Sequence, residues 1–154
     1  MYADVYKRQP HDCAEGFGYR IHTSDGRIVT FSTDLGYVSE EVHQALQGSD
    51  LVVIESNHDV GMLQNGGYPY PLKRRILSDI GHLSNALCAR ILPELAKEGT
   101  TRFMLAHLSR ENNTPDLAYQ TALCSLSMAG LKQGIDFELS VAPRENTAYR
   151  TLLF

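Results

Sequence analysis

Histidines and acidic residues recur at the ends of apolar segments in this chain, and these side chains ligate divalent metals. Asp34 follows one expected strand, Glu55 ends another, and His107 follows a third. His11 precedes all of them, and His82 lies just before an expected helix. Taken singly, each is better explained as an ordinary turn or loop residue. Their recurrence predicts a metal site on the edge of a sheet, where the carboxyl ends of strands bind ligands in open α/β folds.

Glu55 and His82 form a candidate catalytic pair. A carboxylate that orients a histidine makes a good proton shuttle, because imidazole titrates near neutral pH. Glu55 ends an apolar run, and His82 lies just before a helix that Ser84 can cap. Their separation along the chain leaves open the alternative that they are two unrelated polar residues.

Three further residues are candidates for contacting substrate: His58, Lys73 and Arg74. His58 lies in the loop after Glu55, where it could reach a substrate or a metal, or simply hydrogen-bond the loop. Lys73 and Arg74 belong to a basic run that would attract phosphate if it faced the site. The alternative for such a run is a solvated helix face.

The segments around these residues predict an α/β fold with mixed strands. Apolar alternation and an Asp-Gly turn predict a hairpin, and a continuous apolar run ending at Glu55 predicts a strand buried on both faces. The expected strands cover residues 18–23, 28–32, 50–55, 101–106, 137–141 and 149–154. Capping residues and glycine stops predict helices over about 39–47, 72–77, 85–97 and 114–129.

The composition describes one globular domain without a strong charge preference. The chain has 154 residues and a net charge of −4, which gives no basic field for nonspecific nucleic-acid binding. Its three cysteines are widely spaced, which predicts no disulfide framework and a reducing, cytoplasmic location. No apolar stretch is long enough to span a membrane. Residues 1–9 are polar and predict a disordered or foreign tail, followed by a domain over 10–154.

Taken together, the motifs resemble the metallo-β-lactamase-fold hydrolases, and within them the WalJ/YycJ-like branch of DNA-processing nucleases. The motifs that carry the resemblance are Ser-Thr-Asp-Leu-Gly-Tyr-Val-Ser at 32–39, Glu-Ser-Asn-His-Asp at 55–59, the long segment at 73–85 and Ala-His-Leu-Ser at 106–109. The resemblance extends from His11 to the C-terminus. It implies an αββα sandwich, of which this chain resembles mainly the second half.

The resemblance also implies a role for each site residue. His11, Asp34 and His107 match metal ligands of the family, and Glu55 with His82 matches an acid–histidine pair that protonates the leaving group. The implied cofactors are two divalent cations, zinc or manganese, which activate a water for attack on a phosphodiester. DNA is the implied substrate.

One motif of the family is absent from these residues, namely His-x-His-x-Asp-His. We therefore expect this chain by itself to hold at most one cation weakly, and to expose an apolar face that favours self-association. Two alternatives remain at this stage. One is hydrolysis of a small ester or thioester on the same fold, and the other is a non-catalytic remnant.

Overall fold

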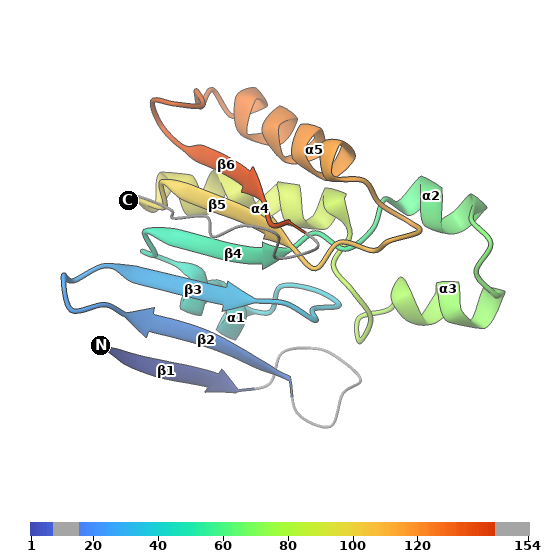
Figure 1. Ribbon diagram of the computed structural model, residues 1–154, viewed down its shortest axis with the longest axis horizontal. Coiled ribbons are helices and arrows are strands. Elements are labelled where there is room, and N and C mark those ends of the chain that lie inside the picture. Colours follow the sequence, from blue (N-terminus) through green and yellow to red (C-terminus); the bar gives the residue numbers. More distant parts are fainter. Residues whose placement is uncertain (8–15, 144–154) are drawn as a thin grey trace.

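Six strands form one mixed sheet in which the spatial order follows the chain order (Figure 1). The computed structural model describes residues 1–7 and 16–143. β1, β2 and β3 pair antiparallel, and β3, β4, β5 and β6 pair parallel. The strands are β1 (Tyr2–Lys7), β2 (Phe17–His22), β3 (Ile28–Ser32), β4 (Leu51–Glu55), β5 (Arg102–Ala106) and β6 (Glu138–Val141).

The helices lie in the crossovers between the parallel strands, and most begin at a side-chain cap. Ser39, Asp59, Ser84 and Thr114 each accept a hydrogen bond from the backbone N–H three residues on, which satisfies a donor that the first helical turn leaves open. The helices are α1 (Glu40–Leu46), α2 (Val60–Asn65), α3 (Tyr70–Ile76), α4 (Asn85–Lys97) and α5 (Pro115–Met128).

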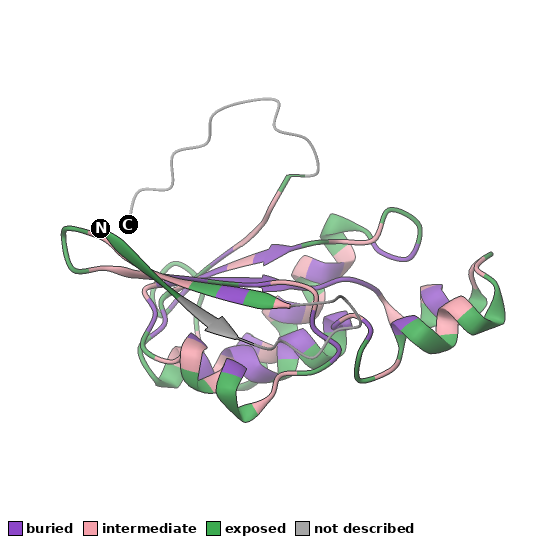
Figure 2. Ribbon diagram, turned by 90° about the horizontal axis from the view of Figure 1, so that it is seen from below, coloured by how far each residue is buried: buried purple, intermediate pink, exposed green. Residues whose placement is uncertain are grey.

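The main core lies between one face of the sheet and helices α1, α4 and α5 (Figure 2). Val52 and Ile54 of β4 point into it and are fully buried, as are Leu92 of α4 and Leu126 of α5. Because β4 is buried along its whole length, its continuous apolar run is explained by contacts on both faces.

The opposite face of the sheet carries a smaller apolar cluster around Val29, Leu51 and Val53. In the part of the chain that the structure describes, no helix packs on this face (Figure 2). Tyr19 lies opposite Phe31 and Phe31 opposite Val53, so these side chains share the face, and Tyr19 and Phe31 remain 46% and 39% exposed. Val29, Leu51 and Val53 are themselves at most 8% exposed, so the exposed apolar surface on this face comes from Tyr19 and Phe31, and the association expected for the chain taken alone stays a prediction.

Most expected elements form where the sequence places them, with two differences, and one expected strand is not tested. Tyr2–Lys7 forms the edge strand β1 and pairs with β2, which differs from the disordered tail expected over residues 1–9. Helix α2 was not expected, although Asp59 is a recognisable N-cap for it. The strand expected over 149–154 lies outside the described residues.

The parallel strands bring several loops to one edge of the sheet, beyond the carboxyl ends of β3, β4 and β5 (Figure 1). Gly36, in the loop after β3, packs directly on the backbone of Asp79, and a Cβ at residue 36 would collide with the Asp79 carbonyl oxygen. This contact requires glycine. It holds the loop that contains Asp34 against the segment that leads to His82. Helices α2 and α3 project outward on the same side (Figure 1).

Candidate metal centre

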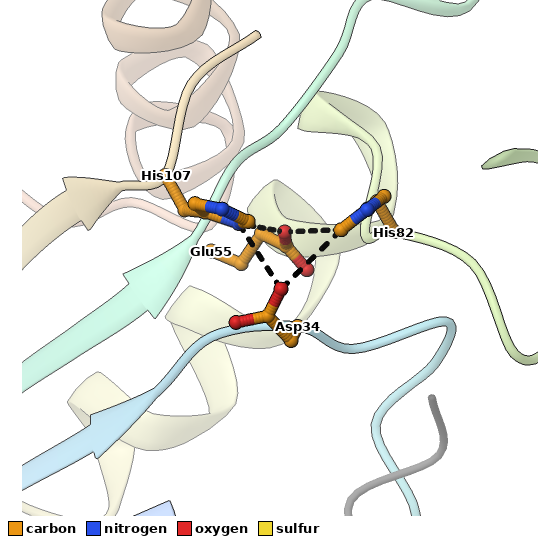
Figure 3. A group of neighbouring side chains, drawn as sticks. All are labelled: Asp34, Glu55, His82 and His107. Carbon is orange, nitrogen blue, oxygen red and sulfur yellow. Dashed lines mark hydrogen bonds and ion pairs between the residues drawn. The ribbon is translucent and has the colours of Figure 1, made fainter. Parts of the chain in front are cut away.

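Four side chains from four separate segments converge at this edge: Asp34, Glu55, His82 and His107 (Figure 3). Asp34 lies two residues after β3, Glu55 is the last residue of β4, and His107 directly follows β5. His82 comes from the segment that precedes α4. Each offers a ligand atom, and these atoms lie within 4.8 Å of one another. The structure thus brings together four of the five residues that the sequence predicted as metal ligands or as the catalytic pair.

Glu55 lies at the centre of the cluster and is fully buried. Its Oε1 atom accepts hydrogen bonds from Nδ1 of His107 at 2.6 Å and from Nδ1 of His82 at 2.8 Å. Its Oε2 atom accepts from the backbone N–H of Leu35 at 2.8 Å and of Leu83 at 3.1 Å. One oxygen therefore contacts two members of the cluster, and the other contacts the residues that directly follow Asp34 and His82.

These four bonds keep Glu55 ionised. Burial alone raises the pKa of the carboxyl, but the hydrogen bonds from His107 and His82 and from the Leu35 N–H outweigh it and lower the pKa to about 2. An ionised carboxylate only accepts, so each histidine must place a proton on Nδ1. In the neutral His107 ring, the lone pair is then on Nε2, the atom that a metal would bind.

Asp34 and His107 adopt a backbone conformation that is uncommon outside glycine. Their φ angles are +63° and +57°, in the left-handed region. Oδ1 of Asp34 lies 3.7 Å from Nδ1 of His107 and 4.0 Å from Nδ1 of His82. Strained conformations of this kind persist where the surroundings hold them, and they cluster at functional sites.

The donor set fits a divalent cation such as zinc or manganese. A carboxylate oxygen from Asp34 and an imidazole nitrogen from His107 are ligands that both metals accept. Glu55 has the position of an outer residue that orients the ligating imidazole, because all of its contacts go to protein N–H groups. The hydrogen bond to Glu55 also raises the pKa of His107, so a proton and a metal ion compete for this ring.

The remaining predicted residues are placed differently. The contact between Glu55 and His82 is confirmed, and the equally short contact between Glu55 and His107 was not foreseen. His11 lies outside the described residues. His58 is only 1% exposed, so it does not face a substrate in this structure, and among residues 1–7 and 16–143 neither of its ring nitrogens has a hydrogen-bond partner.

The two basic candidates lie on α3. Nζ of Lys73 donates to the carbonyl oxygens of Gln64 and Gly66, at 2.8 and 2.7 Å, so this ammonium group caps the end of α2. Arg74 is exposed on the projecting helix. Of the basic run, Lys73 therefore has a structural explanation, and Arg74 remains a candidate for substrate contact.

A buried polar network behind the site was not predicted. Ser56, Asn57, Asn85 and Asn113 are all at most 8% exposed, and hydrogen bonds between them join the segments after β4, before α4 and before α5. The sequence offered one signal for this network: Glu55 and the polar residues after it directly follow the apolar run of residues 51–54.

Comparison with known proteins defines the class. Residues 6–108 match the beta-lactamase superfamily domain, and the chain belongs to that family. The fold agrees with the crystal structure of Zn²⁺-bound PqqB from Methylobacterium extorquens, with a TM-score of 0.57 at 16% identity over 91% of this chain and 47% of that one. The expected α/β, metallo-β-lactamase fold is therefore confirmed.

Two curated relatives are more similar in sequence. The chain is 40% identical over 129 residues to the exodeoxyribonuclease YycJ of Bacillus anthracis and, over the same length, to the exodeoxyribonuclease WalJ of Streptococcus pneumoniae. The matched region is 84% of this chain and 48% of each relative, so the chain spans about half the length of the relatives that it matches. Among the described residues, no helix is long and apolar enough to cross a membrane.

Replacing Glu55 tests the centre of the cluster. In a Glu55→Gln variant the amide NH₂ group would face an N–H donor, so at least one of the four hydrogen bonds is lost. We expect the free energy of unfolding to fall by about 2–5 kcal/mol, measured by urea denaturation. The exposed Glu111→Gln variant is the matched control. Equal urea midpoints for the two variants would contradict the assigned role of Glu55.

Buried His58 predicts a pH dependence of stability. Burial lowers its pKa from 6.5 to about 4. Between these two pH values the unfolded chain binds a proton at this ring and the folded chain does not, so stability falls as the pH falls from 6.5 to 4. A His58→Phe variant should lose a share of this dependence on the order of 3 kcal/mol. Unfolding curves at pH 7.5, 6.5, 5 and 4 measure it, and an unchanged slope would contradict the prediction.

Proposed function

We propose that this chain carries part of the active site of a metal-dependent phosphodiesterase that acts on DNA as an exonuclease. The observation that carries the proposal is the Glu55-centred cluster, in which two histidines and Asp34 meet at the carboxyl edge of a parallel sheet. Membership of the beta-lactamase superfamily and similarity to two proteins named exodeoxyribonuclease support the reaction class.

In this proposal Asp34 and His107 hold the cation, with His11 as a further ligand. When bound, zinc or manganese supplies Lewis-acid polarisation of the scissile phosphate and lowers the pKa of a water. His82 has the position of an acid that donates a proton to the leaving oxygen, and Glu55 orients its ring through the 2.8 Å bond. The proposal assigns two cations to the complete centre, of which this chain alone would hold at most one.

Substrate contact in this proposal comes from the projecting α3. Arg74 is exposed there, and a guanidinium binds phosphate oxygens in a planar, bidentate geometry. Because the protein has a net charge of −4, the local positive charge of this helix and of the metal must attract the DNA backbone. Cys88 and Cys124 are free thiols, which is consistent with a cytoplasmic location.

The proposed reaction depends on Asp34. We expect a polypeptide of the relatives' full length that contains this chain to release nucleotides from DNA in the presence of Mn²⁺. Asp34→Asn should reduce that rate by ~100-fold or more, because the variant lacks the ligand charge. Asp136→Asn, which alters a turn before β6 at the opposite edge of the sheet, is the control. Cleavage of small esters but not DNA would support the alternative substrate class and contradict the nuclease proposal.

We further propose that the chain taken alone associates through the open face of its sheet. Tyr19 and Phe31 are large, partly exposed side chains that extend the apolar cluster around Val53. Contiguous apolar surfaces of this kind mark contacts with another protein surface.

This association can be measured by sedimentation of the isolated chain over a range of concentrations. We expect dimers or larger species for the wild type, and a shift toward monomer for Phe31→Lys, because the new ammonium group cannot be buried in an apolar contact. Tyr37→Lys, at a residue with 45% exposure near α1, should leave the association unchanged. A monomeric wild-type chain that binds no hydrophobic dye would refute the proposal.

A further inference from the structure

Asn57 connects the two segments that carry the histidines of the site. Its backbone N–H donates to the carbonyl oxygen of Leu83 at 2.8 Å, next to His82. Its side-chain Nδ2 donates to the carbonyl oxygen of His107 at 2.8 Å, and its own carbonyl oxygen accepts from the N–H of Ser109 at 2.8 Å. One residue thus binds the backbone of both histidine segments.

Two hydrogen bonds of Asn57 hold the backbone that directly follows the unusual conformation at His107. Residue 107 has a φ angle of +57°, and Asn57 binds the carbonyl of residue 107 and the N–H of residue 109. A left-handed conformation at a residue other than glycine or asparagine must be maintained by its surroundings. The Asn57 side chain supplies such a contact on the carboxyl side of His107.

Asn113 in turn holds the backbone at Asn57 through hydrogen bonds. Nδ2 of Asn113 donates to the carbonyl oxygens of Ser56 and Asn57, at 2.9 and 3.0 Å. Asn113 and Asn85 also bind each other through their side-chain amides, with both distances at 2.9 Å. All four residues are buried, so these bonds are shielded from competition by water. The network ends at the carbonyl oxygen of His107, whose ring binds Glu55 through Nδ1.

We propose that Asn57 is a positioning residue of the metal site: it holds the turn at His107 so that this ring meets Glu55 and the cation at the correct angle. The proposal rests on the proposed metal-dependent function. Asn57 touches His107 only through the backbone and acts through that ring. The observed centroid distance of 5.4 Å between the rings of His82 and His107 is the arrangement that it maintains.

Asparagine suits this role because its side chain is short and carries an N–H group that donates a hydrogen bond. The Nδ2–H group is required opposite the carbonyl oxygen of His107, where an aspartate would present a second acceptor. Asn112, which directly precedes Asn113 in the chain, provides a matched control. It is 2% exposed, like the network residues, and its Nδ2 atom makes no hydrogen bond within the described structure.

The test compares Asn57→Ala with Asn112→Ala by two measurements on the chain as it exists. The first is the NMR resonance of the His107 Nδ1 proton without metal, which reports the 2.6 Å bond to Glu55. The second is a Co²⁺ titration followed by visible absorption, which gives both the affinity and the ligand geometry. We expect Asn57→Ala to lose the resonance and to bind Co²⁺ ~10–100-fold more weakly with an altered spectrum. Asn112→Ala should retain both properties.

Other results overturn the inference. If Asn57→Ala only melts at a lower temperature, with the resonance and the Co²⁺ affinity of the wild type, Asn57 has a purely structural role. If Asn112→Ala loses both properties as well, the effect is general to buried amides. Should Asn57→Ala not fold, Asn57→Ser replaces it, because serine is polar but too short to reach the carbonyl of His107.

The two readouts also separate this inference from the proposed function. A wild-type chain that binds no Co²⁺ counts against the metal site, whereas the His107 resonance in the metal-free chain still decides whether Asn57 positions the ring.

Discussion

A negative charge lies fully buried at the end of β4, and the surrounding loops are arranged to compensate it. Glu55 accepts four hydrogen bonds, two from imidazole rings and two from backbone N–H groups. Burial of an ionised carboxylate is costly unless each oxygen is engaged. Because both Glu55 oxygens must be engaged, the loop after β3, the segment before α4 and the end of β5 all contact this carboxylate. The same contacts determine where His82 and His107 can lie.

The parallel sheet makes that arrangement possible. β3, β4 and β5 run side by side in the same direction, so the residues at their carboxyl ends lie at one edge although long crossovers separate them in sequence. Behind this edge, Asn85 and Asn113 join the loops through buried amide pairs. The site is therefore supported by two sets of hydrogen bonds. One set is made to the charged Glu55 carboxylate, and the other joins the neutral amides of Asn85 and Asn113. Rigid support of this kind is what a metal ligand requires.

The open face of the sheet sets a second constraint. The helices of the described residues cover one side of the sheet, and on the other side the partly exposed Tyr19 and Phe31 extend the apolar cluster around Val53. The chain spans about half the length of the curated relatives that it matches. The proposed metal site and the proposed association surface thus lie on different parts of the same sheet, the first at the carboxyl ends of its strands and the second on the face opposite the main core.

The sequence by itself determined the class of fold, most of its strands and helices, and the residues Asp34, Glu55, His82 and His107. Local signals sufficed for these, because caps, glycine stops and apolar periodicity depend on near neighbours, and the quoted motifs are long. Only the tertiary structure decided that Glu55 contacts both histidines, that His58 is buried, that Lys73 caps α2, and that Asn57 binds the turn at His107. Long-range contacts decide those points, and a sequence pattern does not report which distant atoms meet.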